Sequence, residues 1–509
     1  MPRHPAACAR RVAALVLVAF AATAPARAQD VDADVAALAP SLRRLADKLM
    51  AGDADAADAH AQELVAQGEA GKSWLLLNGV AWAIVDPCAK VDRRNLELAR
   101  RAATLAIGIV GETEPSALDT LARVHAWEGD VAKAAATQQR VMALLPKSFA
   151  GGMRGELAAA AIEYDARLRA SAPKSAKTGP RVPDGCAPAT AAAVEGWCKV
   201  VVHKATGVRL RFVAGGEYWI GMAPGDLDGL SSSVPPEKLR QTVEGESPQR
   251  RVRVSPFYLA ECEVSVAQWR KFAAATGYLS DAELDSESVL ATSIRVAESS
   301  TSIEQVDSDA TWQDPLPEVR RLRQFTLLDT HPVTMVTWND AMMFCAVNGL
   351  RLPTEAEWEF AARGGVAARY WWGPDPADGK DKDNVLDRPA PSYPIAAVSS
   401  AHFPFHDGHS IFAPVDALAP NPFGLRGMIG NVSEWCADPG NLRPYEVLPA
   451  DVAAVDPVMA KPPDEPYMHV VRGGAWLSTP PTARVSVRTL SNGPAGAVTV
   501  GFRPALAAK

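Results

Sequence analysis

One short segment carries several side chains that could hold a metal ion. Three of the nine histidines and an aspartate lie within eight residues of one another, at His402, His406, Asp407 and His409. Imidazole nitrogens and carboxylate oxygens suit iron, copper and zinc. The spacing matches no standard metal-binding motif, and residues 403–405 (Phe-Pro-Phe) favour an irregular loop over a helix. We therefore interpret the segment as a polar loop, with a transition-metal site as the alternative.

Such a loop needs rigid elements around it, and the clearest of these is a short helix. Thr354 and Glu357 have the spacing of a capping box, in which each side chain accepts a hydrogen bond from the other's backbone N–H. Gly364 and Gly365 provide the left-handed backbone that ends a helix. We predict an amphipathic helix between them. Its apolar face comprises Ala356, Phe360 and Ala361, and Glu355 and Glu359 lie off that face.

The second half of the chain has the texture of an α+β domain with few helices and long loops. Alternating polar and apolar residues predict three strands, at residues 209–213, 217–222 and 251–254. Two further capping boxes predict helices that begin after Ser265 and after Thr337. Residues 280–325 are acidic, rich in Ser and weakly periodic, so we interpret them as a surface insertion.

The first half is predicted to be helical. Residues 31–168 are rich in Ala and Leu, and apolar residues recur at the spacing of one helical face, as at Leu77, Val80, Ala81 and Ile84. Residues 74–146 loosely resemble tetratricopeptide-type repeats, which present a concave surface to a protein partner. A plain helical bundle is an equal alternative. Residues 169–195 read as a linker rich in Pro, Gly and Ser, and residues 196–509 as the α+β domain.

The N-terminus has the pattern of a secretory signal peptide. Three Arg precede an apolar run at residues 12–24, and residues 26–28 (Ala-Arg-Ala) form a small-x-small cleavage site. We predict that residues 1–28 are removed and that the protein is exported, to the periplasm or beyond. The apolar run is too short for a membrane span, and we predict none after cleavage.

Cleavage would take away four Arg and change the net charge from −7 to −11. Since no basic stripe stands out, we predict no nucleic-acid partner. An exported chain meets an oxidising compartment, where the closely spaced Cys186 and Cys198 could form a disulfide. The cysteines that remain are Cys88, Cys186, Cys198, Cys262, Cys345 and Cys436.

A series of short motifs runs through the second half in a fixed order. They are Phe212–Glu217, Ile220–Met222, Glu246–Arg250, Phe257–Leu259, Glu263–Ser265, His331–Val333, Val336–Trp338, Arg351–Trp358, Asn421–Leu425, Gly430–Trp435, Arg472–Trp476 and Val500–Arg503. Each motif is weak alone, but their order closely resembles the formylglycine-generating enzyme family, also called sulfatase-modifying factors. The resemblance implies that family's compact α+β fold, which is related to C-type lectins and has much irregular backbone stabilised by Ca²⁺.

The resemblance also implies two calcium sites, each of which needs several oxygen ligands. The first comprises Asn384, the carbonyl of Val385, Asp407 and the carbonyl of His409. The second comprises the carbonyls of Gly430 and Val432 and the carboxylate of Glu434. Its fourth position, Asn or Asp in the family, is Gly427 here, so we expect the second site to bind more weakly.

Catalytic members of the family hold Cu(I) between two cysteine thiolates after the Arg-Gly-Gly motif, and soft thiolates suit Cu(I). The matching positions here are Ser478 and Ala483, and no cysteine falls at either. Ala475 also replaces a serine of the family's pocket, and Ser433 an aromatic residue. We therefore expect no copper and no formylglycine synthesis by the known route, and we assign no catalytic residue. An open space beside Ser478 and Trp476 would indicate ligand binding, and a filled one a structural role.

Two main functions remain open at this point, with residual formylglycine synthesis by an unknown route as a third, less favoured hypothesis. One is an accessory module that binds a ligand, protein or peptide through a lectin-like pocket and the helical region. The other is an oxidoreductase of a different branch, of a nonheme-metal or siderophore-maturation type. Related sulfoxide synthases hold iron on a His cluster of a separate helical domain. The helical half here offers only His60 and His125, which disfavours that arrangement.

Overall fold

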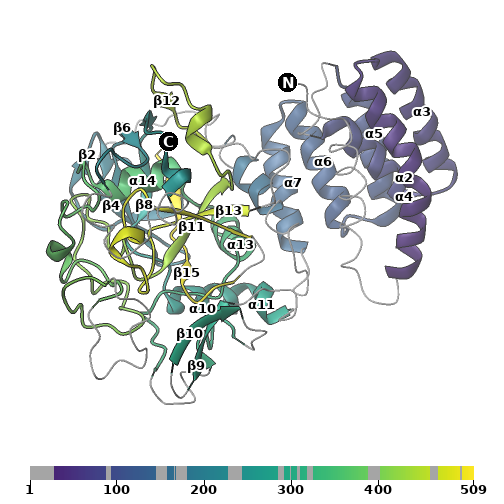
Figure 1. Ribbon diagram of the computed structural model, residues 1–509. Helices are drawn as coiled ribbons and strands as arrows, with labels where there is room; N and C mark the ends of the chain where they lie inside the picture. The colour runs from purple at the N-terminus through teal and green to yellow at the C-terminus, as the bar shows by residue number, and fades with distance from the viewer. Residues whose placement is uncertain are drawn as a thin grey trace. The chain divides into compact units, whose positions relative to one another are not determined.

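The computed structural model, drawn in Figure 1, describes residues 28–86, 93–144, 157–164, 167, 180–226, 243–284, 292–297, 300–305, 310–317, 325–387, 402–458, 468–492 and 496–508. The predicted signal peptide, residues 1–28, lies outside them except for Ala28, and so does Cys88. The chain forms two compact units, Met1–Pro173 and Lys174–Lys509. No helix of the described residues is long and apolar enough to cross a membrane.

The first unit consists of packed α-helices, as predicted. They are α2 (Ala28–Met50), α3 (Ala54–Ala70), α4 (Trp74–Val85), α5 (Leu96–Val110), α6 (Pro115–Trp127) and α7 (Val131–Leu144). Consecutive helices contact each other, and α4 also contacts α2 and α6. The predicted apolar face of α4 is confirmed. Its four residues Leu77, Val80, Ala81 and Ile84 are buried in a core that they share with α2, α3 and α5.

The second unit is the predicted α+β domain, and its strands are short. They are β1 (Cys186–Pro188), β2 (Ala193–Val194), β3 (Trp197–Cys198), β4 (Val200–His203), β5 (Arg209–Val213), β6 (Gly216–Ile220), β7 (Arg250–Val254), β8 (Phe257–Ala260), β9 (Thr292–Ala297), β10 (Ser300–Gln305), β11 (Ser433–Pro439), β12 (Ala454–Val455), β13 (Met468–Arg472), β14 (Arg488–Asn492), β15 (Val500–Gly501) and β16 (Ala505–Ala507). Three of its sheets have the strand orders β1-β4-β5-β8-β16, β14-β13-β11-β15 and β12-β7-β6.

Its described α-helices are α10 (Val266–Thr276), α11 (Asp281–Leu284), α13 (Trp338–Val347) and α14 (Glu355–Arg363). All three predicted capping boxes are present, since Ser265, Thr337 and Thr354 each accept the backbone N–H three residues on and receive the reciprocal bond. Gly364 ends α14 at φ +58°, in the left-handed region that glycine adopts without a steric penalty. These local rules therefore fix where the three helices begin.

Two expectations for irregular segments are wrong in part. The predicted linker, residues 169–195, contains β1 and β2, and β1 pairs with β4 in the largest sheet. The predicted insertion, residues 280–325, contains the hairpin of β9 and β10. The suggested disulfide between Cys186 and Cys198 is not formed in the described chain, and both cysteines are buried. The strand register places Cys186 opposite His203, whereas the Cys198 thiol donates to the carbonyls of Thr190 and Val200.

A long irregular region joins α14 to β11. Its described residues form loops and one short 3₁₀ turn, η3 (Pro376–Gly379). Val385, Phe403 and Met428 from these loops pack in one core cluster with Trp358 of α14. The loops that carry the predicted calcium ligands are therefore positioned by burial against this helix.

Candidate functional site

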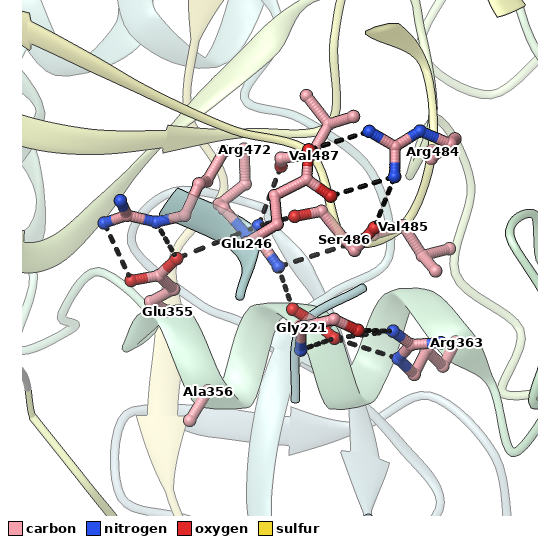
Figure 2. A network of polar contacts seen from close by, with 12 residues as sticks. Gly221, Glu246, Glu355, Ala356, Arg363, Arg472, Arg484, Val485, Ser486 and Val487 are labelled. Atoms are coloured by element: carbon pink, nitrogen blue, oxygen red, sulfur yellow. Dashed lines mark hydrogen bonds and ion pairs between the residues drawn. The ribbon is translucent and has the colours of Figure 1, made fainter. Parts of the chain in front are cut away.

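Helix α14 carries two glutamates that are fully buried. Every residue of the helix is buried, so the prediction of an amphipathic helix is wrong. Instead of facing water, Glu355 pairs with Arg488, and Glu359 pairs with Arg363 and Arg472. Burial raises the pKa of Glu355, but Arg488 and Arg472 more than offset this and lower it below its usual value. The cluster in Figure 2 thus compensates each buried carboxylate with a guanidinium.

Arg472 connects this cluster to the turn where the family's chemistry would take place. Its Nη1 donates to the carbonyls of Ser486 and Val487, at 2.7 and 2.8 Å. Arg484, in the same part of the chain, forms a two-fold hydrogen-bonded pair with Glu246, at 2.7 and 2.9 Å (Figure 2). Since Arg472 is the last residue of β13, these bonds fix both the start of the Gly-Gly turn and the segment that returns from it.

The turn brings the two expected copper positions close together but gives neither a metal ligand. A Cβ at Gly474 would lie 2.8 Å from Ser478 Oγ and 3.0 Å from the carbonyl of Thr482, next to Ala483. Ser478 Oγ accepts the N–H of Ala475 at 2.9 Å, so the hydroxyl stabilises the turn. Ala483 is fully buried in the core cluster of α14. Methyl and engaged hydroxyl groups cannot replace two thiolates around Cu(I).

Trp476, which lies two residues before the first of these positions, is packed in the interior. Trp476 is only 3% exposed, and its ring lies edge-on to Phe412, with centroids 6.5 Å apart. Its backbone N–H donates to the carbonyl of Asn431 at 3.0 Å, which ties the turn to the segment before β11. Ser478 remains half-buried. A filled space beside Ser478 and Trp476 was predicted to indicate a structural role. The burial of Trp476 favours that role for Ser478, the position that matches a copper-binding cysteine of the family.

The described cysteines do not supply the missing thiolates. Cys345 lies in α13, Cys436 in β11, and Cys262 between β8 and α10. Burial raises the pKa of Cys262 to about 12, and it also raises the pKa values of Cys345 and Cys436. Without a bound metal, these thiols therefore stay protonated at neutral pH.

Asp407 contacts two of the other three residues predicted for the first calcium site, Val385 and His409. Its Oδ2 accepts the N–H of Val385 at 3.0 Å, and its Oδ1 accepts the N–H of His409 at 2.8 Å. Burial raises the pKa of Asp407 to about 7, and the Asp387 carboxylate adds to the increase. Next to Val385, the fully buried Asn384 has an Oδ1 without a hydrogen-bond partner in the described chain. A half-buried carboxylate and an orphaned amide oxygen are of the oxygen type that Ca²⁺ prefers.

The histidines of the candidate transition-metal segment have separate surroundings. His402 Nδ1 lies 3.0 Å from the carbonyl of Phe403. His406 is exposed and lies 3.7 Å from Asp387, and the bond from His409 to Asp407 comes from its backbone. Within the described ranges, no group of three or more His, Cys, Asp or Glu side chains could hold a metal ion.

The residues of the second predicted calcium site fit a cation poorly. Glu434 is fully buried, and both of its oxygens accept hydrogen bonds from Arg503 at 2.6 Å. Its Oε2 also accepts the indole N–H of Trp358 at 2.7 Å. Gly430 and Val432 contribute only carbonyls, so the one carboxylate of this set is already neutralised by a guanidinium. A calcium ion placed there would face that positive charge.

Sequence reasoning misses two other buried carboxylates in this region. Glu263 Oε1 accepts the side-chain N–H of Asn431 at 3.0 Å. Asp383 Oδ2 accepts the indole N–H of Trp371 at 3.0 Å and the backbone N–H of Ile429 at 3.2 Å. Burial raises the pKa of Glu263 to about 8 and that of Asp383 well above its usual value, and the Glu263 charge adds to the second increase. The sequence indicates them only weakly. Glu263 is the first residue of one of the short motifs, and Asp383 directly precedes Asn384, a predicted calcium ligand.

Comparisons with known proteins agree with this architecture. Residues 204–508 match the family described as Sulfatase-modifying factor enzyme 1-like domain. A formylglycine-generating enzyme of Thermomonospora curvata is 35% identical over 271 residues, which are 51% of this chain and 85% of the relative. An inactive C-alpha-formylglycine-generating enzyme 2 of Bos taurus is 29% identical over 279 residues, 51% of this chain and 80% of the relative. The structure of PvdO from Pseudomonas aeruginosa aligns with 60% of this chain and 97% of its own, at 21% identity and a TM-score of 0.41.

The fold and the site define a loop-rich α+β domain, organised around a buried, ion-paired helix and the turn after Arg-Gly-Gly. The chain belongs to the sulfatase-modifying factor family, which confirms the resemblance seen in its motifs. The helical unit precedes the part of the chain that matches the family.

Proposed function

We propose that this chain is an exported accessory protein of the family, which binds a protein, a peptide or another ligand and does not use copper. The observation that carries the proposal is the chemistry at the two copper positions. The Ser478 hydroxyl accepts a hydrogen bond from the backbone of its own turn, and the methyl group of Ala483 is buried in the core. The scaffold that holds the turn is complete, so loss of the thiolates has not been accompanied by loss of the fold.

The relatives support this proposal, because the family contains a protein named as an inactive formylglycine-generating enzyme as well as active ones. The domain is therefore retained in at least one chain without the activity. In the present chain, a role other than oxidation of a sulfatase cysteine would explain why the scaffold is retained although the two copper-binding cysteines are absent.

The helical unit offers an aromatic surface feature that suits a protein partner. Trp127, at the end of α6, is 47% exposed, and the guanidinium of Arg94 lies 4.3 Å from the centre of its ring. Its indole N–H donates to the carbonyl of Val85 at 2.9 Å, so the ring is held in place at the surface. Trp and Arg are enriched among the residues that dominate protein interfaces. We propose this tetratricopeptide-like unit as the partner-binding part.

The absence of the copper reaction is tested with a thiol peptide that carries the sulfatase sequence Cys-x-Pro-x-Arg. The purified protein, loaded with Cu(I), is incubated with peptide and O₂, and the products are analysed by mass spectrometry. The Thermomonospora relative serves as the positive control. We expect an aldehyde from the relative and unchanged thiol from this chain. An aldehyde formed by this chain would overturn the proposal.

Metal analysis of the exported protein separates an accessory protein from an oxidoreductase. We expect calcium without stoichiometric iron or copper, with Asn384, Asp407 and the carbonyls of Val385 and His409 as the proposed calcium ligands. Stoichiometric iron or copper would instead favour the oxidoreductase alternative. In that case, replacement of His402, His406 and His409 by Ala would show whether the histidine segment binds the metal.

A further inference from the structure

Three arginines surround one glutamate just after strand β8. Arg209 Nε donates to Glu261 Oε2 at 3.2 Å, and Arg211 Nη2 donates to Glu261 Oε1 at 3.1 Å. Arg426 Nε lies 3.7 Å from the same Oε1. Arg209 and Arg211 are two positions apart in β5, so their side chains leave the strand on one face. These four residues form the Glu261 cluster.

Backbone contacts hold the cluster in place. The N–H of Arg426 donates to the carbonyl of Glu261 at 2.8 Å, and the N–H of Glu261 donates to the carbonyl of Arg209 at 2.8 Å. Gly424 lies directly against Arg211, because a Cβ there would lie 2.6 Å from Arg211 Cζ, and the glycine has φ +86°. Any other residue at this position would displace the guanidinium. The arginines are therefore positioned before any ligand binds.

The cluster carries more positive than negative charge. Guanidinium groups stay protonated, so three of them and one carboxylate leave a surplus of two positive charges. In the described parts of the chain, Glu261 is the only carboxylate that forms an ion pair with any of the three arginines. The side chains of Glu261, Arg211 and Arg426 are 11%, 19% and 25% exposed. Because this partial burial limits screening by water, an unbalanced charge here is costly.

The cluster also has hydrogen-bond donors without acceptors. Arg211 Nε is buried and has no partner among the described residues. Within the described chain, the Arg209 side chain donates through Nε and that of Arg211 through Nη2, so the other Nη atoms of this pair can bind a ligand. The Arg209 side chain is 52% exposed, which keeps its donors within reach of the solution. A group that supplies both negative charge and acceptor oxygens would satisfy the cluster.

We propose that the Glu261 cluster binds a doubly charged oxyanion, which is a phosphate or sulfate group. Guanidinium groups bind such oxygens through pairs of parallel N–H···O bonds. Two negative charges match the surplus of the cluster, whereas a carboxylate would leave one positive charge unbalanced. The Nη atoms of Arg209 and Arg211 donate to the anion, and Glu261 orients both guanidiniums. The inference does not depend on the proposed function.

Calorimetric titration of the full-length exported protein with inorganic phosphate, sulfate and acetate, at constant ionic strength, tests the site. Arg209→Ala removes one arginine that binds the anion. Arg251→Ala is the matched control, because Arg251 is 45% exposed and pairs with Glu217 outside the cluster. We expect the wild type and Arg251→Ala to bind one equivalent of phosphate or sulfate, and Arg209→Ala to bind it roughly tenfold more weakly. The anion that binds more tightly identifies the group.

No saturable binding of phosphate or sulfate to the wild type would overturn the proposal, as would an equal Kd for the wild type and Arg209→Ala. Acetate that binds as tightly as phosphate and sulfate would overturn the assignment of a doubly charged group. If Arg209→Ala does not fold, Glu261→Gln decides, because it removes a negative charge and keeps the shape of the side chain. Tighter binding of the anion by Glu261→Gln supports the site, and unchanged or weaker binding overturns it.

Discussion

Two buried polar regions of the second unit are constructed in opposite ways. Around α14, Glu355 and Glu359 face Arg363, Arg472 and Arg488. Around the loop of residues 427–431, the buried carboxylates leave oxygens without partners in the described parts of the chain. In the first region each of these carboxylates faces a guanidinium, and the buried atom left without a hydrogen-bond partner among the described residues is a donor, Arg472 Nε, whereas in the second region the unpartnered atoms are carboxylate oxygens. The difference separates carboxylates whose charge the chain compensates from carboxylates whose pKa values stay raised by burial.

The largest effect should come from breaking the ion-paired region around α14. Glu359→Gln would leave Arg472 and Arg363 buried without their shared carboxylate, which typically costs about 3–5 kcal/mol. Glu217→Gln is the matched control, because Glu217 and Arg251 are both more than 40% exposed. Such an exposed pair contributes less than about 1 kcal/mol. Urea unfolding measures both variants, and similar losses in the two would contradict the view that α14 is the anchor.

Removal of calcium should affect the loops around Asp407. When the free Ca²⁺ concentration is about 100 times Kd, a single site stabilises the fold by about 2.7 kcal/mol. We expect EDTA to lower the Tm of the wild type, and we expect Asp407→Asn to lose most of this response because it lacks the proposed site. Scanning calorimetry with and without EDTA provides the measurement. A Tm that is indifferent to EDTA would count against the proposed calcium site at Asp407.

The two regions should also respond to pH with opposite sign. In the folded state the pKa of Glu263 is raised from 4.5 to about 8, so folding favours its protonated form. In EDTA, the stability that this proton contributes is fully present below about pH 4.5 and is lost as the pH rises through about 8. The lowered pKa of Glu355 acts in the other direction, because its contribution is lost only as the pH falls below its usual value.

We therefore expect the free energy of unfolding in EDTA to decrease between pH 5 and pH 8, and excess Ca²⁺ to flatten part of the slope by favouring ionised Asp407. Glu263→Gln should reduce the slope without added metal. Chemical unfolding at several pH values tests this. The same slope in wild type and in Glu263→Gln would show that Glu263 is ionised in the folded protein, because the lowered pKa values of His331 and His469 affect both chains equally.

The smallest effect is expected at the former copper position. Ser478→Ala leaves the N–H of Ala475 without its acceptor, which typically costs about 1 kcal/mol. Partner binding should not change, because the hydroxyl already bonds its own turn and has no other role in the proposal. Unfolding and binding measurements on Ser478→Ala and Ser478→Cys test this. A loss of partner binding without a loss of stability would assign the hydroxyl to recognition.

Local rules predicted much of the fold and little of the site. Thr354, Glu357 and Gly364 determine α14 by interactions within ten residues, so its ends could be predicted. The surroundings of that helix could not, because Glu359 meets Arg472 across 113 positions of sequence. Glu263 and Asn431 are 168 positions apart, and nothing near either residue indicates the other. The strands β1 and β2 were missed because two or three residues are too few for a periodic pattern.

The guanidinium of Arg472 has a consequence for how such proteins are recognised. Because it anchors the Arg-Gly-Gly turn to a buried helix, selection for a folded domain alone is enough to preserve the motif after the reactive sulfur atoms are gone. A match to the motif therefore indicates that the fold is retained, and does not by itself indicate that the chain has the activity. Whether a given chain can oxidise a cysteine has to be decided from positions three and eight residues after the turn's Ala475, where the fold imposes no cysteine.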